Sequence, residues 1–136
     1  MKRTLVGLVA VAGLLSASGS APAAAHHAIQ AEFDLSKRGE FTGVLTRFAM
    51  INPHCRWFFE VKTPGGAPVE WELTAGSPGA LRAAGLLRAF KVGDTFRATY
   101  APARNGAKLG RVIDFYFSDG RVITLYHDNP NNPNDL

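Results

Sequence analysis

The sequence predicts an all-β protein, a small OB-like antiparallel barrel of five to six strands with one short helix between the third and fourth strands. Three observations support this fold. Between residues 40 and 126, apolar and polar side chains alternate with a period of two, which is typical of half-buried strands. Turn-forming Gly, Pro and Asn residues separate these segments. A helical pattern occurs once, at the position that the element order of an OB barrel requires.

The first three strands are predicted at residues 40–48, 56–62 and 69–74. Asn52 and Pro53 separate the first strand from the second, because this pair is a turn signal. The segment 63–68 (TPGGAP) also reads as a turn, so the second and third strands should form a hairpin. In the third strand, apolar residues alternate with Glu70 and Glu72, and we interpret these glutamates as solvent-exposed charge.

A short helix is predicted within residues 77–88, after the third strand. Ser77 is a good N-cap and Pro78 suits the first helical position. Three further strands are predicted at residues 95–100, 111–117 and 122–126. An Asn105-Gly106 pair predicts a hairpin turn before the fifth strand.

Closing these strands into a barrel would bury one face of each strand and remove the exposed sheet edges. An open β-sandwich is the alternative, and the position of the helix favours the barrel. The predicted barrel core consists of Leu45, Phe58, Val69, Trp71, Phe96, Ile113 and Phe115.

The first 25 residues have the three parts of a secretory signal peptide. Two basic residues precede an uncharged apolar run at 4–15, and small residues follow it. The apolar run is shorter than the roughly 20 residues that span a bilayer as a helix. We therefore expect cleavage near Ala23 to Ala25, a periplasmic or secreted protein, and no stable membrane insertion after cleavage.

The chain then divides into a signal peptide (1–25), a leader with a histidine pair (26–39), the barrel domain (40–126) and a disordered tail (127–136). Cleavage removes Lys2 and Arg3 and no acidic residue, so the formal net charge falls from +4 to +2. Export and this modest charge disfavour a nucleic-acid partner.

The sequence contains no recognisable catalytic constellation. Neither a Gly-x-Ser-x-Gly nor a His-Glu-x-x-His motif occurs, and Gly65-Gly66 lies in a hairpin turn rather than a phosphate-binding loop. The single cysteine, Cys55, excludes an intramolecular disulfide. We expect a binding module rather than an enzyme.

Two histidines, His26 and His27, stand at the predicted new N-terminus. A free α-amine has a pKa of about 7.7–8.0, so it can lose its proton and bind a metal near neutral pH. Cleavage after Ala25 would combine this amine with the His26 imidazole, and His27 or His54 would add a second imidazole. Cleavage after Ala23 would place His26 third, which suits a square-planar Cu(II) or Ni(II) chelate.

We therefore predict copper binding at His26, His27 and His54. The alternative is a solvated leader without a specific metal. Cys55, with Met50, is a possible set of soft ligands for Cu(I), and burial of this cysteine as a small hydrophobe is the competing interpretation. The predicted metal site does not include His127, which begins the tail.

The aromatic residues of the strands carry a second functional prediction. Alternation puts Trp57 and Phe59 on the strand face opposite Phe58, so one of these two sets should stay outside the barrel. We expect Trp57, Phe59 and Tyr116 to form an outward patch that binds an exported redox enzyme or another exported partner.

A series of short motifs follows one another from the predicted mature start. They are His26-His27, Glu32-Phe33-Asp34, Thr42-Gly43-Val44, Asn52-Pro53-His54, Gly76-Ser77-Pro78, Val92-Gly93-Asp94 and Ala103-Arg104-Asn105-Gly106. In this order and spacing they resemble a family of small exported bacterial proteins called domain of unknown function 6152. The resemblance covers about residues 26–125. It implies an exported small domain and carries no established activity.

Overall fold

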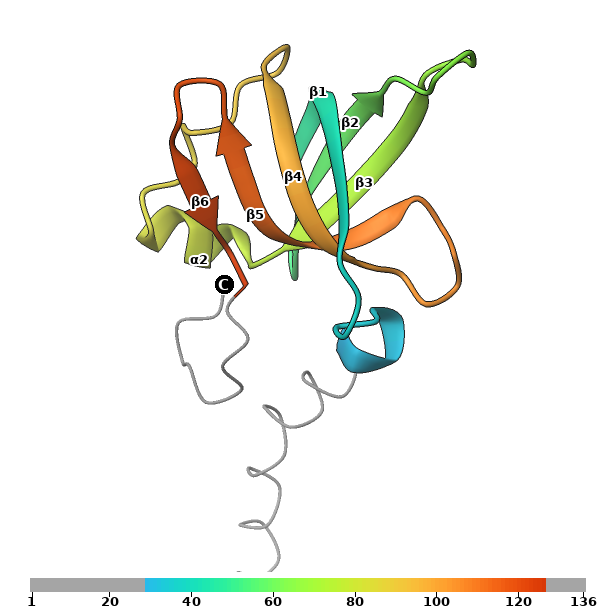
Figure 1. The fold of residues 1–136 in the computed structure, drawn as a ribbon. Helices are drawn as coiled ribbons and strands as arrows, with labels where there is room; N and C mark the ends of the chain where they lie inside the picture. Colours follow the sequence, from blue (N-terminus) through green and yellow to red (C-terminus); the bar gives the residue numbers. More distant parts are fainter. Residues whose placement is uncertain (1–28, 127–136) are drawn as a thin grey trace, which may run out of the picture.

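The computed structural model describes residues 29–126, which form a small barrel (Figure 1). The strands are β1 (Gly39–Met50), β2 (Cys55–Val61), β3 (Val69–Ala75), β4 (Thr95–Pro102), β5 (Leu109–Phe117) and β6 (Val122–Thr124). Helix α2 (Pro78–Ala83) lies between β3 and β4, and residues 29–32 are also helical. The predicted signal peptide, the cleavage site, His26, His27 and the tail lie outside the described residues.

Five of the strands close on themselves. β1 pairs antiparallel with β2 and with β4, β2 pairs with β3, and β4 pairs with β5. The barrel closes where Glu72–Thr74 of β3 run parallel to Leu109–Arg111 of β5. The predicted OB-like barrel is confirmed, with this one parallel pairing in place of the wholly antiparallel arrangement expected. β6 is an additional strand beside β5.

The long strand β1 serves two neighbours because it bends. Its first half, Gly39–Val44, pairs with β4, and its second half pairs with β2. The register shifts between Leu45 and Arg47, and a bulge of this kind bends a strand and increases its twist. At Gly39 an added Cβ would collide with the Tyr100 ring, so the absence of a side chain lets this ring pack onto β1.

Helix α2 occupies the first part of the segment in which a short helix was predicted, and it packs against the barrel core. The Ser77 side chain accepts a hydrogen bond from the Ala80 backbone amide at 3.1 Å, and Pro78 follows in the first turn, as predicted. Gly85 adopts a φ of 71°, a left-handed conformation that ends the helix well before Arg88. The fully buried Leu81 joins the barrel core.

The barrel interior is dominated by aromatic rings. Trp57, Phe59, Phe96 and Phe115 are almost completely buried, together with Leu45 and Leu73. Their ring centroids lie 5.3 to 6.1 Å apart in tilted or edge-to-face pairs. Phe90, which follows α2, adds another ring to this cluster.

The predicted orientation of β2 is wrong. Trp57 and Phe59 are fully buried in the interior. Phe58 is buried too, at 7% exposure, but it lies outside the central cluster and beneath the Arg47 guanidinium, 3.5 Å from its ring centroid. The reason is register: Phe59 lies opposite Leu45 and Trp57 lies opposite Leu73, and cross-strand neighbours share a face.

The predicted core is therefore confirmed only in part. Leu45, Phe96 and Phe115 lie in the central cluster, as predicted, and Trp71 packs against it while remaining partly exposed. Val69 is only partly buried, and Ile113 is buried outside the central cluster.

Candidate functional site

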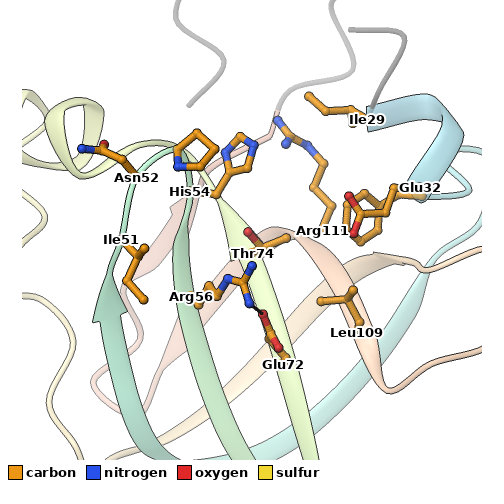
Figure 2. Close-up of a pocket in the computed structure, with 12 residues that line it drawn as sticks. Ile29, Glu32, Ile51, Asn52, His54, Arg56, Glu72, Thr74, Leu109 and Arg111 are labelled. Carbon is orange, nitrogen blue, oxygen red and sulfur yellow. Dashed lines mark ion pairs between the residues drawn. The ribbon is translucent and has the colours of Figure 1, made fainter. Parts of the chain in front are cut away.

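A pocket of about 220 Å³ opens on the outer face of β2 and β3, beside the loop that joins β1 to β2 (Figure 2). We call it the β2–β3 pocket. OB folds bind their ligands on this strand face and its flanking loops. The polar lining consists of Glu32, Asn52, His54, Arg56, Glu72, Thr74 and Arg111. Ile29, Phe33, Ile51, Pro53 and Leu109 provide the apolar part.

The β1–β2 loop places His54 at this pocket. The backbone amide of Cys55 donates to the Gly76 carbonyl at 2.9 Å, which ties the end of the loop to the residues before α2. The Cys55 side chain is fully buried in the core, whereas His54 is exposed and lines the pocket. The Asn52-Pro53 peptide bond in the same loop is cis.

The burial of Cys55 removes it from the pocket's chemistry. Desolvation raises the pKa of its thiol, so the metal-binding thiolate is disfavoured. The structure agrees with the competing interpretation, in which Cys55 is a small buried hydrophobe. Met50 is half exposed and does not line the β2–β3 pocket.

One wall of the pocket carries a cross-strand ion pair. An Arg56 guanidinium nitrogen lies 3.1 Å from a Glu72 carboxylate oxygen (Figure 2). Both side chains are partly exposed, so solvent screens their attraction. The Thr74 hydroxyl donates to the Cys55 carbonyl at 3.1 Å and fixes the start of β2 against the end of β3. This wall is therefore polar and held in place.

Arg111 of β5 supplies a nearly buried cation. Arg111 is only 6% exposed. Its guanidinium carbon lies 5.0 Å from the centre of the Tyr126 ring. In Figure 2 this side chain extends from β5 towards Ile29. Arg111, His54 and Ile29 also line an adjoining pocket with Ser77 and Ala80, again of about 220 Å³. These three residues thus stand where the two pockets meet.

The N-terminal segment is fixed to the barrel beside the pocket. Phe33 is 2% exposed and packs with Ala103 and Ile29 in a small second hydrophobic cluster. The Arg104 amide donates to the Glu32 carbonyl, and the Asp34 amide donates to the Pro102 carbonyl, both at 2.9 Å. These contacts hold Ile29 at the pocket rim.

The predicted metal ligands divide into two groups. His54 lies in the pocket, whereas His26 and His27 lie outside the described residues, three and two positions before Ile29. Within residues 29–126, no three His, Cys, Asp or Glu side chains are close enough together to hold a metal ion. His54 consequently has no set of such partners in that part of the chain.

The predicted aromatic patch is not on the surface. Trp57 and Phe59 face the interior, and only Tyr116 of the three lies on the outer side, partly exposed. The Arg97 guanidinium lies 3.5 Å above its ring centre and also pairs with Glu40 at 2.8 Å. This arrangement excludes the outward patch that the alternation predicted.

Arg111 and Glu32 line the pocket without having been predicted from the sequence, and Glu72 was predicted only as surface charge. An available signal was the OB element order, which places ligands on the second and third strands and the loop before them. In the part of the chain that the structure describes, no helix has the length and apolar character needed to cross a membrane.

One comparison with known proteins bears on this site. The model of a family of unknown function, DUF6152, matches residues 14–112. This match includes the histidine pair, the β1–β2 loop with His54, and Arg111. No curated protein and no solved structure matches the chain.

Proposed function

The chain belongs to the family of unknown function DUF6152, and we propose that it is an exported, non-enzymatic binding module whose cargo is copper. The ligands in this proposal are the mature N-terminal amine, His26, His27 and His54. The module acts in the periplasm or outside the cell, where it holds copper or delivers it to an exported partner.

The observation that carries this proposal is that Ile29 and His54 line the same pocket. Only Ala28 separates Ile29 from His27. An extended chain spans at most about 3.6 Å per residue, so the His27 Cα lies within about 7 Å of the Ile29 Cα, and the His26 Cα within about 11 Å. This short separation supports the proposal, because it allows the two imidazoles to approach the rim on which His54 lies.

The chemistry of these donors favours copper. An amine and imidazoles are nitrogen ligands, and a tetragonal set of nitrogens is the arrangement that Cu(II) prefers. Since His54 is exposed, it is accessible to an ion from solvent. Phe33 and Glu32 are anchored to the barrel, so few residues separate the proposed N-terminal ligands from a fixed point. This lowers the conformational entropy cost of closing the proposed site.

The test is a copper titration of protein that cells have exported and processed, with its N-terminus identified by mass spectrometry. We expect the wild type to bind one Cu(II), and a His26→Ala/His27→Ala variant to bind it at least about tenfold more weakly. Loss of a residue that only supports a ligand typically weakens metal binding about 10- to 100-fold, and loss of the ligand itself should weaken it at least as much. His54→Ala should weaken binding in the same direction.

An Asn105→Ala variant, in the exposed turn before β5, is the matched control and should bind as the wild type does. Equal affinities for the wild type and the His26/His27 variant would overturn the proposal. Circular dichroism of each variant separates loss of a ligand from loss of the fold.

A further inference from the structure

The charged side chains of the β2–β3 pocket balance one another. Arg56 and Glu72 form an ion pair at 3.1 Å, so their charges largely cancel. Arg111 and Glu32 are then the remaining cation and anion of the lining. Glu32 is exposed, and no cation among residues 29–126 forms an ion pair with its carboxylate. The pocket therefore presents one charge of each sign to a ligand.

The remaining cation and anion lie at the same end of the pocket. Residues 29–32 are helical, and side chains three positions apart on a helix are neighbours, so Ile29 and Glu32 share a face. The Arg111 side chain extends from β5 towards Ile29 (Figure 2). Arg111 and Glu32 are thus both adjacent to Ile29, and a single small molecule can contact both.

The Arg111 guanidinium suits a carboxylate even though it lies over the Tyr126 ring, 5.0 Å from the ring centre. An aromatic ring contacts the flat face of a guanidinium, whereas a carboxylate accepts hydrogen bonds from N–H groups in its plane. The two contacts are compatible. Arg111 is only 6% exposed, and such hydrogen bonds are stronger where water is largely excluded.

The rest of the pocket suits a compact apolar group. Ile29, Phe33 and Leu109 line it, and Ile51 is 55% exposed at the same pocket, so its large apolar side chain is uncovered. The volume of about 220 Å³ is below the roughly 300–1,000 Å³ that is usual for sites of drug-sized ligands. The ligand is therefore a smaller molecule.

We propose that the β2–β3 pocket binds a free α-amino acid with an apolar side chain. Arg111 binds the carboxylate, Glu32 binds the ammonium group, and the apolar lining contacts the side chain. A carboxylic acid without an amine would bring a like charge to Glu32, and an amine without a carboxylate would do the same at Arg111. A zwitterion avoids both repulsions. This site consists of residues 29–126 alone and is independent of copper.

The experiment titrates the exported protein, freed of metal, with L-leucine, 4-methylpentanoate and 3-methylbutylamine by isothermal titration calorimetry. The last two compounds keep the apolar skeleton of leucine but lack its ammonium or its carboxylate. We expect leucine to bind with a Kd of about 1 mM or lower. Each analogue should bind at least about tenfold more weakly, because it loses one charge-assisted contact. NMR amide shifts should change at pocket residues such as Thr74.

Glu32→Gln is the first variant, because Glu32 is exposed and its substitution should spare the fold. It should bind leucine at least about tenfold more weakly and 4-methylpentanoate no more weakly than the wild type does. Glu70→Gln is the matched control, since Glu70 is exposed on β3 and does not line the pocket. This control should bind leucine as the wild type does.

Arg111→Met is the second variant, and it should remove the preference for leucine over 3-methylbutylamine. Its matched control is Arg121→Met, which also removes a guanidinium that lies over a ring, that of Phe117, but outside the pocket. Circular dichroism shows whether Arg111→Met folds. If it does not, the two analogues and Glu32→Gln decide the question.

Three results would overturn the inference. The first is a wild type that shows no binding of leucine up to about 10 mM. The second is binding of 4-methylpentanoate or 3-methylbutylamine as tight as that of leucine. The third is equal affinity of the wild type and Glu32→Gln for leucine.

Discussion

The barrel interior and the β2–β3 pocket use opposite kinds of side chain for opposite purposes. The interior is filled by rings such as Trp57, Phe96 and Phe115, which exclude water. The pocket gathers Arg56, Glu72 and other charged groups, most of them in contact with solvent. Burial of apolar area stabilises a fold, whereas partly exposed charges contribute little to stability. Substitutions in the interior should therefore affect folding, and substitutions in the pocket should affect binding.

The largest expected effect is at Trp57. Trp57→Ala should lower the free energy of unfolding by about 3–5 kcal/mol, because it removes a large ring from a packed core. Trp57→Phe should cost clearly less, since the buried Trp57 Nε1 has no hydrogen-bond partner among residues 29–126 and its removal relieves that penalty. Urea denaturation measures both.

Phe58→Ala is the matched control for this position, because Phe58 lies on the other face of the same strand beneath Arg47. Its loss of stability should be smaller than that of Trp57→Ala. An equal or larger loss would show that the two faces of β2 are not energetically distinct.

The cap of α2 should give the next largest effect. Ser77→Ala removes the acceptor of the Ala80 amide, so the free energy of unfolding should fall by about 1 kcal/mol. Ser118→Ala, in an exposed turn, should leave the stability unchanged. Ser77 and Ala80 also line the adjoining pocket. A copper titration of Ser77→Ala therefore checks whether the start of α2 affects metal binding as well as stability.

The ion pair in the pocket should contribute less still. A double-mutant cycle with Arg56→Gln and Glu72→Gln should give a coupling free energy of less than about 1 kcal/mol, reduced further by salt, because both groups are partly exposed. Thermal or urea unfolding of the four proteins at two ionic strengths measures it. A coupling well above this value would mean that the pocket also stabilises the barrel.

The smallest expected effect is on the pH dependence of stability. It concerns Asp34, which lies where the N-terminal segment meets the barrel. Hydrogen bonds from Ser36 and Lys37 lower the pKa of its carboxyl group from 3.8 to about 2. A lowered pKa means that the stabilising contribution is present above pH 3.8 and is lost as the pH falls towards 2. NMR titration should give this pKa, and Ser36→Ala should raise it. A wild-type pKa near 3.8 would contradict the contact of 2.6 Å between the Ser36 hydroxyl and Asp34.

The interior was predictable where alternation had a clear phase. In β4, Thr95 and Arg97 flank Phe96, and in β5 Asp114 precedes Phe115, so these polar neighbours indicate the buried face. In β2, residues 57–59 are all aromatic, so these three residues alone do not show which side of the strand is buried. The register against Leu45 and Leu73 places Trp57 and Phe59 in the interior. The flanking residues did carry a signal, because Arg56 and Glu60 alternate with Phe58 and are exposed, which marks that face as the outer one.

The pocket was predictable only at His54, which a loop and a turn signal place beside the second strand. Glu32 and Arg111 reach the pocket through long-range structure. Glu32 depends on the docking of Phe33 against Ala103, and Arg111 depends on the parallel pairing of β3 and β5. Both contacts join residues that are far apart in the sequence, so they form only when the barrel closes and local patterns do not predict them.

Ile29 and Tyr126, where the described segment begins and ends, both lie beside Arg111, and this has a practical consequence for labelling the protein. A bulky group inserted next to either of these residues would crowd the pocket rim. The hairpin turn at 63–68 is largely exposed and lies at the tip of β2 and β3, away from the helical residues 29–32 and from the end of β6 (Figure 1). Such tips tolerate insertions, so a label or an immobilisation peptide belongs there.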